Sequence, residues 1–133
     1  MEQIGELEKA GIKTIVNLRS RLKLVERERQ WVEETGMRYH SYPLRYWLSP
    51  GIEDMERLFS VIETPENNPV FIHCFHGADR TGIVIAAYRI MRENWTFEDA
   101  YREMVACGFH RVRVYHYKLA LKRIHADFQG TMN

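Results

Sequence analysis

The chain has 133 residues, enough for one domain with one modest hydrophobic core. Its 19 Lys and Arg residues nearly balance its 18 Asp and Glu residues, so the formal net charge is +1. This balance argues against a protein that binds nucleic acid or an anionic membrane through charge over its whole surface. With 45% hydrophobic and 28% charged residues, the composition is that of a globular domain and excludes a mainly disordered chain. We expect one monomeric domain covering residues 1–133, or the same domain with a trimmed N-terminus.

No apolar run approaches the roughly 18 residues of a membrane-spanning helix, and the start Met1-Glu2-Gln3 does not resemble a signal peptide. We therefore expect no membrane insertion and a cytoplasmic location, with export as the alternative if a leader has been removed. Two cysteines, Cys74 and Cys107, are too few for a disulfide framework. We interpret Cys107 as a structural thiol because no chemically active partner surrounds it in the sequence.

Strands and helices are predicted to alternate along the chain. A short helix precedes residues 12–18, which are β-branched and apolar and predict a buried strand. Residues 22–35 predict a charged surface helix. The later elements follow in chain order: a strand at 37–44, an amphipathic helix, a loop at 65–69, a strand at 70–72, a buried helix at 83–91, a helix from a Thr96–Asp99 capping box to about Cys107, and a last helix from Val114 to Phe128.

The amphipathic helix between the second and third strands has a clear expected start. Ser49 is predicted as its N-cap and Pro50 as its first helical residue. Four apolar residues then share one helix face: Met55, Leu58, Phe59 and Ile62. The alternation of strands and helices predicts an α/β layered fold, with a mostly parallel central sheet flanked by helices. Ligands bind beyond the carboxyl ends of the strands in such sheets, and Cys74 is expected at one of them.

Residues 73–82 read His-Cys-Phe-His-Gly-Ala-Asp-Arg-Thr-Gly and connect the strand at 70–72 to the buried helix. We call residues 74–80 the cradle, because successive backbone N–H groups in such a turn converge on one point, which the positive end of the helix dipole also faces. Gly77 permits close approach. Such settings lower the pKa of a cysteine from about 8.5 to roughly 3.5–7.5, so Cys74 is a candidate nucleophile. Arg80, at the helix start, can bind two oxyanion oxygens.

The Cys-x5-Arg pattern from Cys74 to Arg80, preceded by His73 and followed by Thr81 and Gly82, resembles the signature of the protein tyrosine phosphatase superfamily. The similarity is to its small bacterial members of the dual-specificity type. It extends over most of the chain, including the strand at 13–19 and the helix after Arg80. The resemblance implies hydrolysis of phosphate monoesters through a phosphocysteine intermediate, with no metal and no cofactor.

The resemblance also implies a role for each residue around the nucleophile. Arg80 and the cradle N–H groups hold the equatorial phosphate oxygens in the transition state. Thr81 supplies a hydroxyl that helps the thiolate leave, and His73 orders the loop and supports the low pKa of Cys74. Substrate contacts are expected from a further set of positions: Phe75, His76, Gly77, Ala78, Thr81 and Gly82.

The proton for the leaving group is harder to assign. Relatives usually supply it from an Asp on an upstream loop, but residues 42–50 contain no carboxylate. Asp79 resembles the in-loop Asp of the myotubularin and Sac-type phosphoinositide phosphatases. Our hypothesis is that Asp79 donates the proton or orients the water that does; the alternative is that it only bonds loop amides. Asp54, expected in the first turn of a helix, is the second candidate.

The sequence is compatible with two classes of substrate and with two alternative functions. Cationic side chains would suit an inositol polyphosphate, whereas an aromatic wall of Tyr46 and Trp47 would suit phosphotyrosine in a phosphoprotein. The cations are His76, Arg45, Arg111 and Arg113. A catalytically weak phosphate-binding module of the same fold is one alternative function, and a rhodanese-type sulfurtransferase is another. An ATP-binding phosphate loop is excluded because its Gly-x4-Gly-Lys-Ser/Thr motif is absent.

Overall fold

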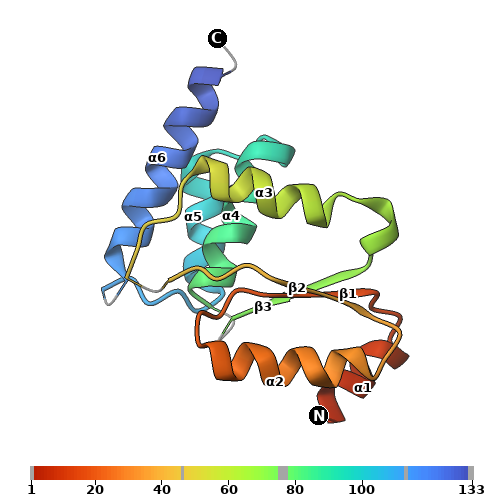
Figure 1. Cartoon of the computed structure of the whole chain (residues 1–133). Coiled ribbons are helices and arrows are strands. Elements are labelled where there is room, and N and C mark those ends of the chain that lie inside the picture. The colour runs from red at the N-terminus through yellow and green to blue at the C-terminus, as the bar shows by residue number, and fades with distance from the viewer. Residues whose placement is uncertain (1, 46, 75–77, 113, 132–133) are drawn as a thin grey trace.

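A computed structural model describes residues 2–45, 47–74, 78–112 and 114–131 (Figure 1). The centre of the fold is a parallel sheet in the order β2-β1-β3. Its strands are β1 (Thr14–Asn17), β2 (Arg38–Ser41) and β3 (Val70–His73). The register pairs Asn17 with both Ser41 and His73, so the carboxyl ends of the three strands meet at one edge.

Helices cover both faces of the sheet (Figure 1). One face carries α1 (Glu2–Lys9) and α2 (Leu22–Glu33). The other carries α3 (Ile52–Ile62) and α4 (Arg80–Glu93), and α5 (Phe97–Ala106) and α6 (Tyr115–Thr131) pack on α4. A 3-10 helix, η1 (Pro65–Asn67), precedes β3. The predicted α/β fold with a parallel sheet between helices is therefore confirmed.

Two hydrophobic clusters form because side chains alternate across β1. Ile15 packs with Ile4 and Val32 from the α1–α2 layer. Val16 joins a larger cluster with α3, α4 and α6, where Phe59 and other apolar side chains are fully buried. In the part of the chain that the structure describes, no helix combines the length and the apolar character needed to cross a membrane.

Several predicted boundaries differ from the observed ones. The predicted N-cap at Ser49 is wrong, since α3 begins at Ile52 and its N-cap is Gly51. The N–H of Gly51 donates to Oδ2 of Asp54 at 2.9 Å. The side chain of Asp54, in the first turn of α3, thereby satisfies the backbone N–H of the N-cap residue. The predicted loop at 65–69 contains η1. The helix predicted at 83–91 runs from Arg80 to Glu93, and half of its residues are buried, whereas Ile85 on it is 37% exposed.

Candidate active site

Cys74 and Arg80 lie at the two ends of the cradle, as the sequence predicts. Cys74 directly follows β3 and is 7% exposed, and Arg80 opens α4 and is 8% exposed. The Leu18 N–H donates to the His73 carbonyl at 2.9 Å, which holds the residue before Cys74 beside the end of β1. Nη1 of Arg80 donates to the Leu44 carbonyl at 3.3 Å. The guanidinium thereby reaches from α4 to the segment after β2, at the carboxyl edge of the sheet.

Asp79 connects the cradle to the segment between α5 and α6. It is 4% exposed and precedes α4 without capping it through its side chain. Oδ1 of Asp79 accepts a hydrogen bond from the His110 N–H at 3.0 Å. Nδ1 of His110 also lies 3.0 Å from Oδ1 and 2.9 Å from Oδ2. The backbone N–H that donates to Asp79 in this contact is therefore that of His110, which lies outside the cradle.

A buried carboxylate of α2 holds His73. Nε2 of His73 lies 2.9 Å from each oxygen of Glu28, which is 7% exposed. The same carboxylate accepts from Nδ2 of Asn17 at 2.8 Å and lies 3.8 Å from Nη2 of Arg19. Burial raises the pKa of Glu28, but the hydrogen bond and charge of His73, with smaller effects of Tyr39 and Arg19, outweigh it. The pKa of Glu28 is therefore below its ordinary value.

The sequence predictions missed Glu28, although a signal for it is present. Val25, Glu28 and Val32 follow the spacing i, i+3 and i+7 on α2, and all three are buried. A carboxylate within the apolar face of a helix is costly unless it is paired and hydrogen-bonded, so such a position indicates an ion pair. Asn17, a fully buried amide that directly follows Ile15 and Val16 in β1, carries the same kind of signal.

The two residues after Arg80 differ in their surroundings. The hydroxyl of Thr81 is buried and has no hydrogen-bond partner among the described residues. A buried hydroxyl without a partner is uncommon, and it fits a group that awaits a ligand or an intermediate. Gly82 faces α5, since a Cβ there would lie 3.3 Å from Cγ of Met104. A methyl group at Gly82 would therefore require the flexible side chain of Met104 to shift slightly.

Ala78 is 8% exposed and lies against the segment between α5 and α6. A Cβ placed on Gly108 would be 3.7 Å from its Cβ. The other predicted substrate-binding positions, Phe75, His76 and Gly77, lie outside the described residues. The same holds for Tyr46 and Arg113.

Asp54 lies in the first turn of α3, where the sequence places it. Its Oδ1 accepts from the Tyr42 hydroxyl at 2.9 Å, while Oδ2 binds the Gly51 N–H. Asp54 lines a cavity of about 390 Å³ together with Leu44 and Arg45. Because the carbonyl of Leu44 also accepts from Arg80, this cavity reaches the residue that the guanidinium contacts.

The remaining candidates lie on the surface. Trp47 is 69% exposed, and Arg45 and Arg111 are exposed. Cys107 is exposed at the C-cap of α5, so it does not pack in the core as a structural thiol would. No group of three or more His, Cys, Asp or Glu side chains is arranged to hold a metal ion in the ranges that the structure describes.

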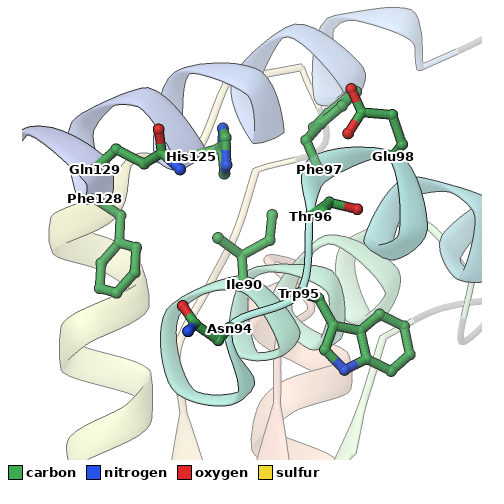
Figure 2. A pocket seen from close by; sticks show the side chains of 9 residues that line it. All are labelled: Ile90, Asn94, Trp95, Thr96, Phe97, Glu98, His125, Phe128 and Gln129. Atoms are coloured by element: carbon green, nitrogen blue, oxygen red, sulfur yellow. The ribbon is translucent and has the colours of Figure 1, made fainter.

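A separate hollow of about 290 Å³ lies between the α4–α5 turn and α6 (Figure 2). Ile90 of α4, Trp95 of the turn, and His125 and Phe128 of α6 are among its lining residues. Its lining includes none of the predicted site residues, so it offers positions for control substitutions.

The fold is similar to that of solved phosphatase structures. The core catalytic domain of the PP-IP phosphatase SIW14 from S. cerevisiae, in complex with citrate, is similar with a TM-score of 0.76 and 18% identity, covering 98% of this chain and 80% of that chain. P. aeruginosa TpbA in complex with pTyr gives a TM-score of 0.71 and 21% identity, covering 97% of this chain and 76% of that chain.

The sequence comparison identifies the family. Residues 1–94 match the family described as polymorphic toxin system, DSP-PTPase phosphatase, and the chain belongs to it. It is also 28% identical to the dual specificity protein phosphatase TpbA of Pseudomonas aeruginosa over 108 residues, which are 81% of this chain and 47% of the relative. The chain thus spans about half the length of the curated relatives it matches. The resemblance to dual-specificity-type phosphatases is confirmed.

Proposed function

We propose that the chain is a cysteine-based phosphatase that hydrolyses phosphate monoesters without a metal ion. The observation that carries this proposal is the placement of Cys74 and Arg80. Both are buried, they stand at the two ends of one loop, and that loop joins the carboxyl edge of a parallel sheet to the start of α4. Family membership supports the same chemistry.

The proposed reaction has two steps. In the first, Sγ of Cys74 forms a bond to phosphorus while the bond from phosphorus to the leaving oxygen breaks, which gives a phosphocysteine. Arg80 binds two phosphate oxygens as charge shifts onto them. In the second, water attacks phosphorus and the Cys74 thiolate leaves, assisted by the hydroxyl of Thr81. The buried Thr81 hydroxyl, which has no partner among the described residues, supports this role.

We propose that Asp79 takes part in supplying the proton to the leaving group, either as the donor or by orienting the water that donates it. Its position directly before Arg80 supports this role. Asp54 is the second candidate, because it lines the cavity that reaches Leu44. The pH–rate profiles of Asp79→Asn and Asp54→Asn on an alkyl phosphate separate the two. Wild-type kcat in Asp79→Asn would exclude Asp79.

For the substrate, we propose a phosphoprotein or an inositol polyphosphate. The exposed Arg45 and Arg111 favour a polyanion, and the exposed Trp47 favours the ring of phosphotyrosine. The relatives represent both classes, since one structure of TpbA holds pTyr and SIW14 is a PP-IP phosphatase. We expect a reducing compartment such as the cytoplasm to suit the enzyme, because a thiolate of low pKa oxidises easily.

Hydrolysis of p-nitrophenyl phosphate in EDTA, compared between wild type and Cys74→Ser, tests the proposed function. We expect turnover by wild type and none by Cys74→Ser. Phosphate binding without turnover by wild type would instead indicate a binding module. Transfer of sulfur from thiosulfate to cyanide would indicate a sulfurtransferase.

A further inference from the structure

His110 and Asp79 form a pair beside the cradle. Asp79 is almost fully buried and directly precedes Arg80, whereas the side chain of His110 is 42% exposed. Both the backbone N–H and Nδ1 of His110 contact the carboxylate, at distances of 2.9–3.0 Å. Two contacts from one residue determine the position of the imidazole ring and also its orientation.

The segment that carries His110 is anchored on both sides. Phe109 is 5% exposed and makes an edge contact with the ring of Tyr101 on α5. On the other side, the buried Val114 donates its N–H to the His110 carbonyl at 3.0 Å. Together with the approach of Gly108 to Ala78, these contacts hold the ring at the rim of the cradle.

The pair has the arrangement by which a carboxylate prepares a histidine for proton transfer. A carboxylate on one ring nitrogen fixes the tautomer and the orientation, and the other nitrogen then exchanges a proton with the substrate. Here Nδ1 faces Asp79, and Nε2 lies on the opposite edge of the ring. The backbone N–H of His110 can only donate, so Oδ1 of Asp79 acts as an acceptor. Asp79 thus orients His110 as a hydrogen-bond acceptor, and the imidazole is the group of the pair to consider for proton exchange with the substrate.

We propose that His110 is the general acid of the reaction and that Asp79 is its positioning residue; this inference rests on the proposed phosphatase function. As the bond between Sγ of Cys74 and phosphorus forms, the electron pair of the breaking P–O bond passes to the leaving oxygen. The proton on Nε2 of His110 moves to that oxygen. In the second step, neutral Nε2 takes a proton from the attacking water as the S–P bond breaks and the Cys74 thiolate is restored.

Each member of the pair is followed in the sequence by an arginine. Arg80 follows Asp79 on α4, and Arg111 follows His110 in the α5–α6 segment. Asp54, the alternative acid, has both carboxylate oxygens bound to the Tyr42 hydroxyl and the Gly51 N–H. Its contacts are those of a helix cap.

A comparison of leaving groups tests the proposal. p-Nitrophenolate leaves readily without a proton, but phenolate needs one. His110→Asn keeps a side-chain N–H near the position of Nδ1, so it can still bond Asp79, and it lacks Nε2. We expect kcat/KM on phenyl phosphate to fall by about 100-fold or more, the usual contribution of a general acid, with a much smaller fall on p-nitrophenyl phosphate. The basic limb of the pH profile on phenyl phosphate should also disappear.

His125→Asn, in the hollow of Figure 2, is the matched control and should show no dependence on the leaving group. Urea unfolding of both variants checks that the fold is kept. Equal losses on both substrates in His110→Asn, or no loss on phenyl phosphate, would overturn the proposal. So would a loss specific to phenyl phosphate in Asp79→Asn but absent in His110→Asn, because Asp79 would then be the donor. Failure of wild type to hydrolyse p-nitrophenyl phosphate would instead refute the proposed function.

Discussion

Nε2 of His73 lies 2.9 Å from each carboxylate oxygen of Glu28 and thereby joins two layers of the fold. Glu28 belongs to α2, on one face of the sheet, and His73 ends β3 directly before Cys74. Asn17 of the central strand donates to the same carboxylate at 2.8 Å. One buried side chain therefore holds the ends of β1 and β3 together at the start of the cradle.

Removal of the Glu28 carboxylate should lower both the stability of the fold and the rate of the reaction. In Glu28→Ala, the amide of Asn17 and the ring of His73 lose their shared acceptor in a poorly hydrated place. We expect the free energy of unfolding to fall by about 3 kcal/mol, as for other broken buried pairs, and kcat/KM to fall with it. Glu28→Gln keeps the shape and one acceptor, so it should be more stable than Glu28→Ala. Urea unfolding and turnover of p-nitrophenyl phosphate measure the two effects.

Glu103→Gln is the control for this prediction. Oε1 of Glu103 lies 3.0 Å from Nε of Arg89, in a pair between α5 and α4 that contains no site residue. Partly exposed pairs of this kind contribute about 1 kcal/mol or less, so stability and turnover should change little. If Glu28→Gln lost no more activity than Glu103→Gln, Glu28 would have no influence on the nucleophile.

Acid should destabilise the protein partly through Glu28. Its pKa in the folded protein is below the ordinary value of 4.5. The unfolded chain therefore binds this proton more tightly than the folded protein does. The stabilising contribution is complete above the ordinary pKa and is lost as the pH falls through the lower, folded pKa. Urea unfolding at pH 7 and at a pH below 4.5 should show a larger loss in wild type than in Glu28→Gln. Equal losses would contradict the assignment.

The layered fold and the positions of Cys74 and Arg80 in it could be predicted from the sequence because local patterns determine them. Cys74 directly follows β3, and Arg80 opens α4 six residues later. The predicted cap of α5 is also local, and the Thr96 hydroxyl does accept from the Asp99 N–H at 3.1 Å. The start of α3 could not be predicted in this way, because Ser49 and Gly51 both suit an N-cap.

The contacts that complete the site join distant parts of the sequence. Glu28 and His73 are 45 residues apart, and Asp79 and His110 are 31 apart. No local pattern specifies which carboxylate meets which histidine, since the pairing depends on how the helices pack on the sheet. The sequence therefore predicts Cys74 as the proposed nucleophile and Arg80 as the proposed oxyanion ligand. The partners of His73 and Asp79, which are Glu28 and His110, emerge only from the fold.

The guanidinium of Arg80 should not be replaceable by an amine. A lysine at this position keeps the charge but loses the planar pair of donors that bind two oxyanion oxygens. It also loses the reach to the Leu44 carbonyl, which Nη1 contacts at 3.3 Å. We expect kcat of Arg80→Lys on p-nitrophenyl phosphate to fall by about 100-fold or more, as when an oxyanion donor is removed. Activity close to that of wild type would show that charge alone suffices.

Gly82→Ala tests whether Gly82 serves packing or substrate binding. The added Cβ would meet Cγ of Met104 at 3.3 Å, but Met104 is flexible and can move slightly. Alanine also gains about 0.5–1 kcal/mol over glycine within a helix, which offsets that contact. We expect nearly unchanged stability and turnover, measured by thermal unfolding and with p-nitrophenyl phosphate. A large rise in KM with intact stability would show that Gly82 contacts the substrate.

Two glycines with similar backbone conformations allow the effect of backbone strain on stability to be distinguished from an effect on turnover. Gly11 has φ +93 and Gly108 has φ +103, so an alanine at either position is strained by roughly 1–2 kcal/mol. Gly11 lies in the turn before β1 with nothing within 4 Å of an added Cβ, whereas such an atom on Gly108 would contact Ala78 of the cradle.

Gly11→Ala and Gly108→Ala should therefore lose similar stability in urea unfolding, but only Gly108→Ala should lose turnover of p-nitrophenyl phosphate. We expect the strain at Gly108 to move the segment in which the His110 N–H donates to Asp79, and this movement to displace the residue directly before Arg80. Loss of turnover in both variants would indicate a general effect of destabilisation. Unchanged turnover in Gly108→Ala would show that the cradle does not depend on the α5–α6 segment.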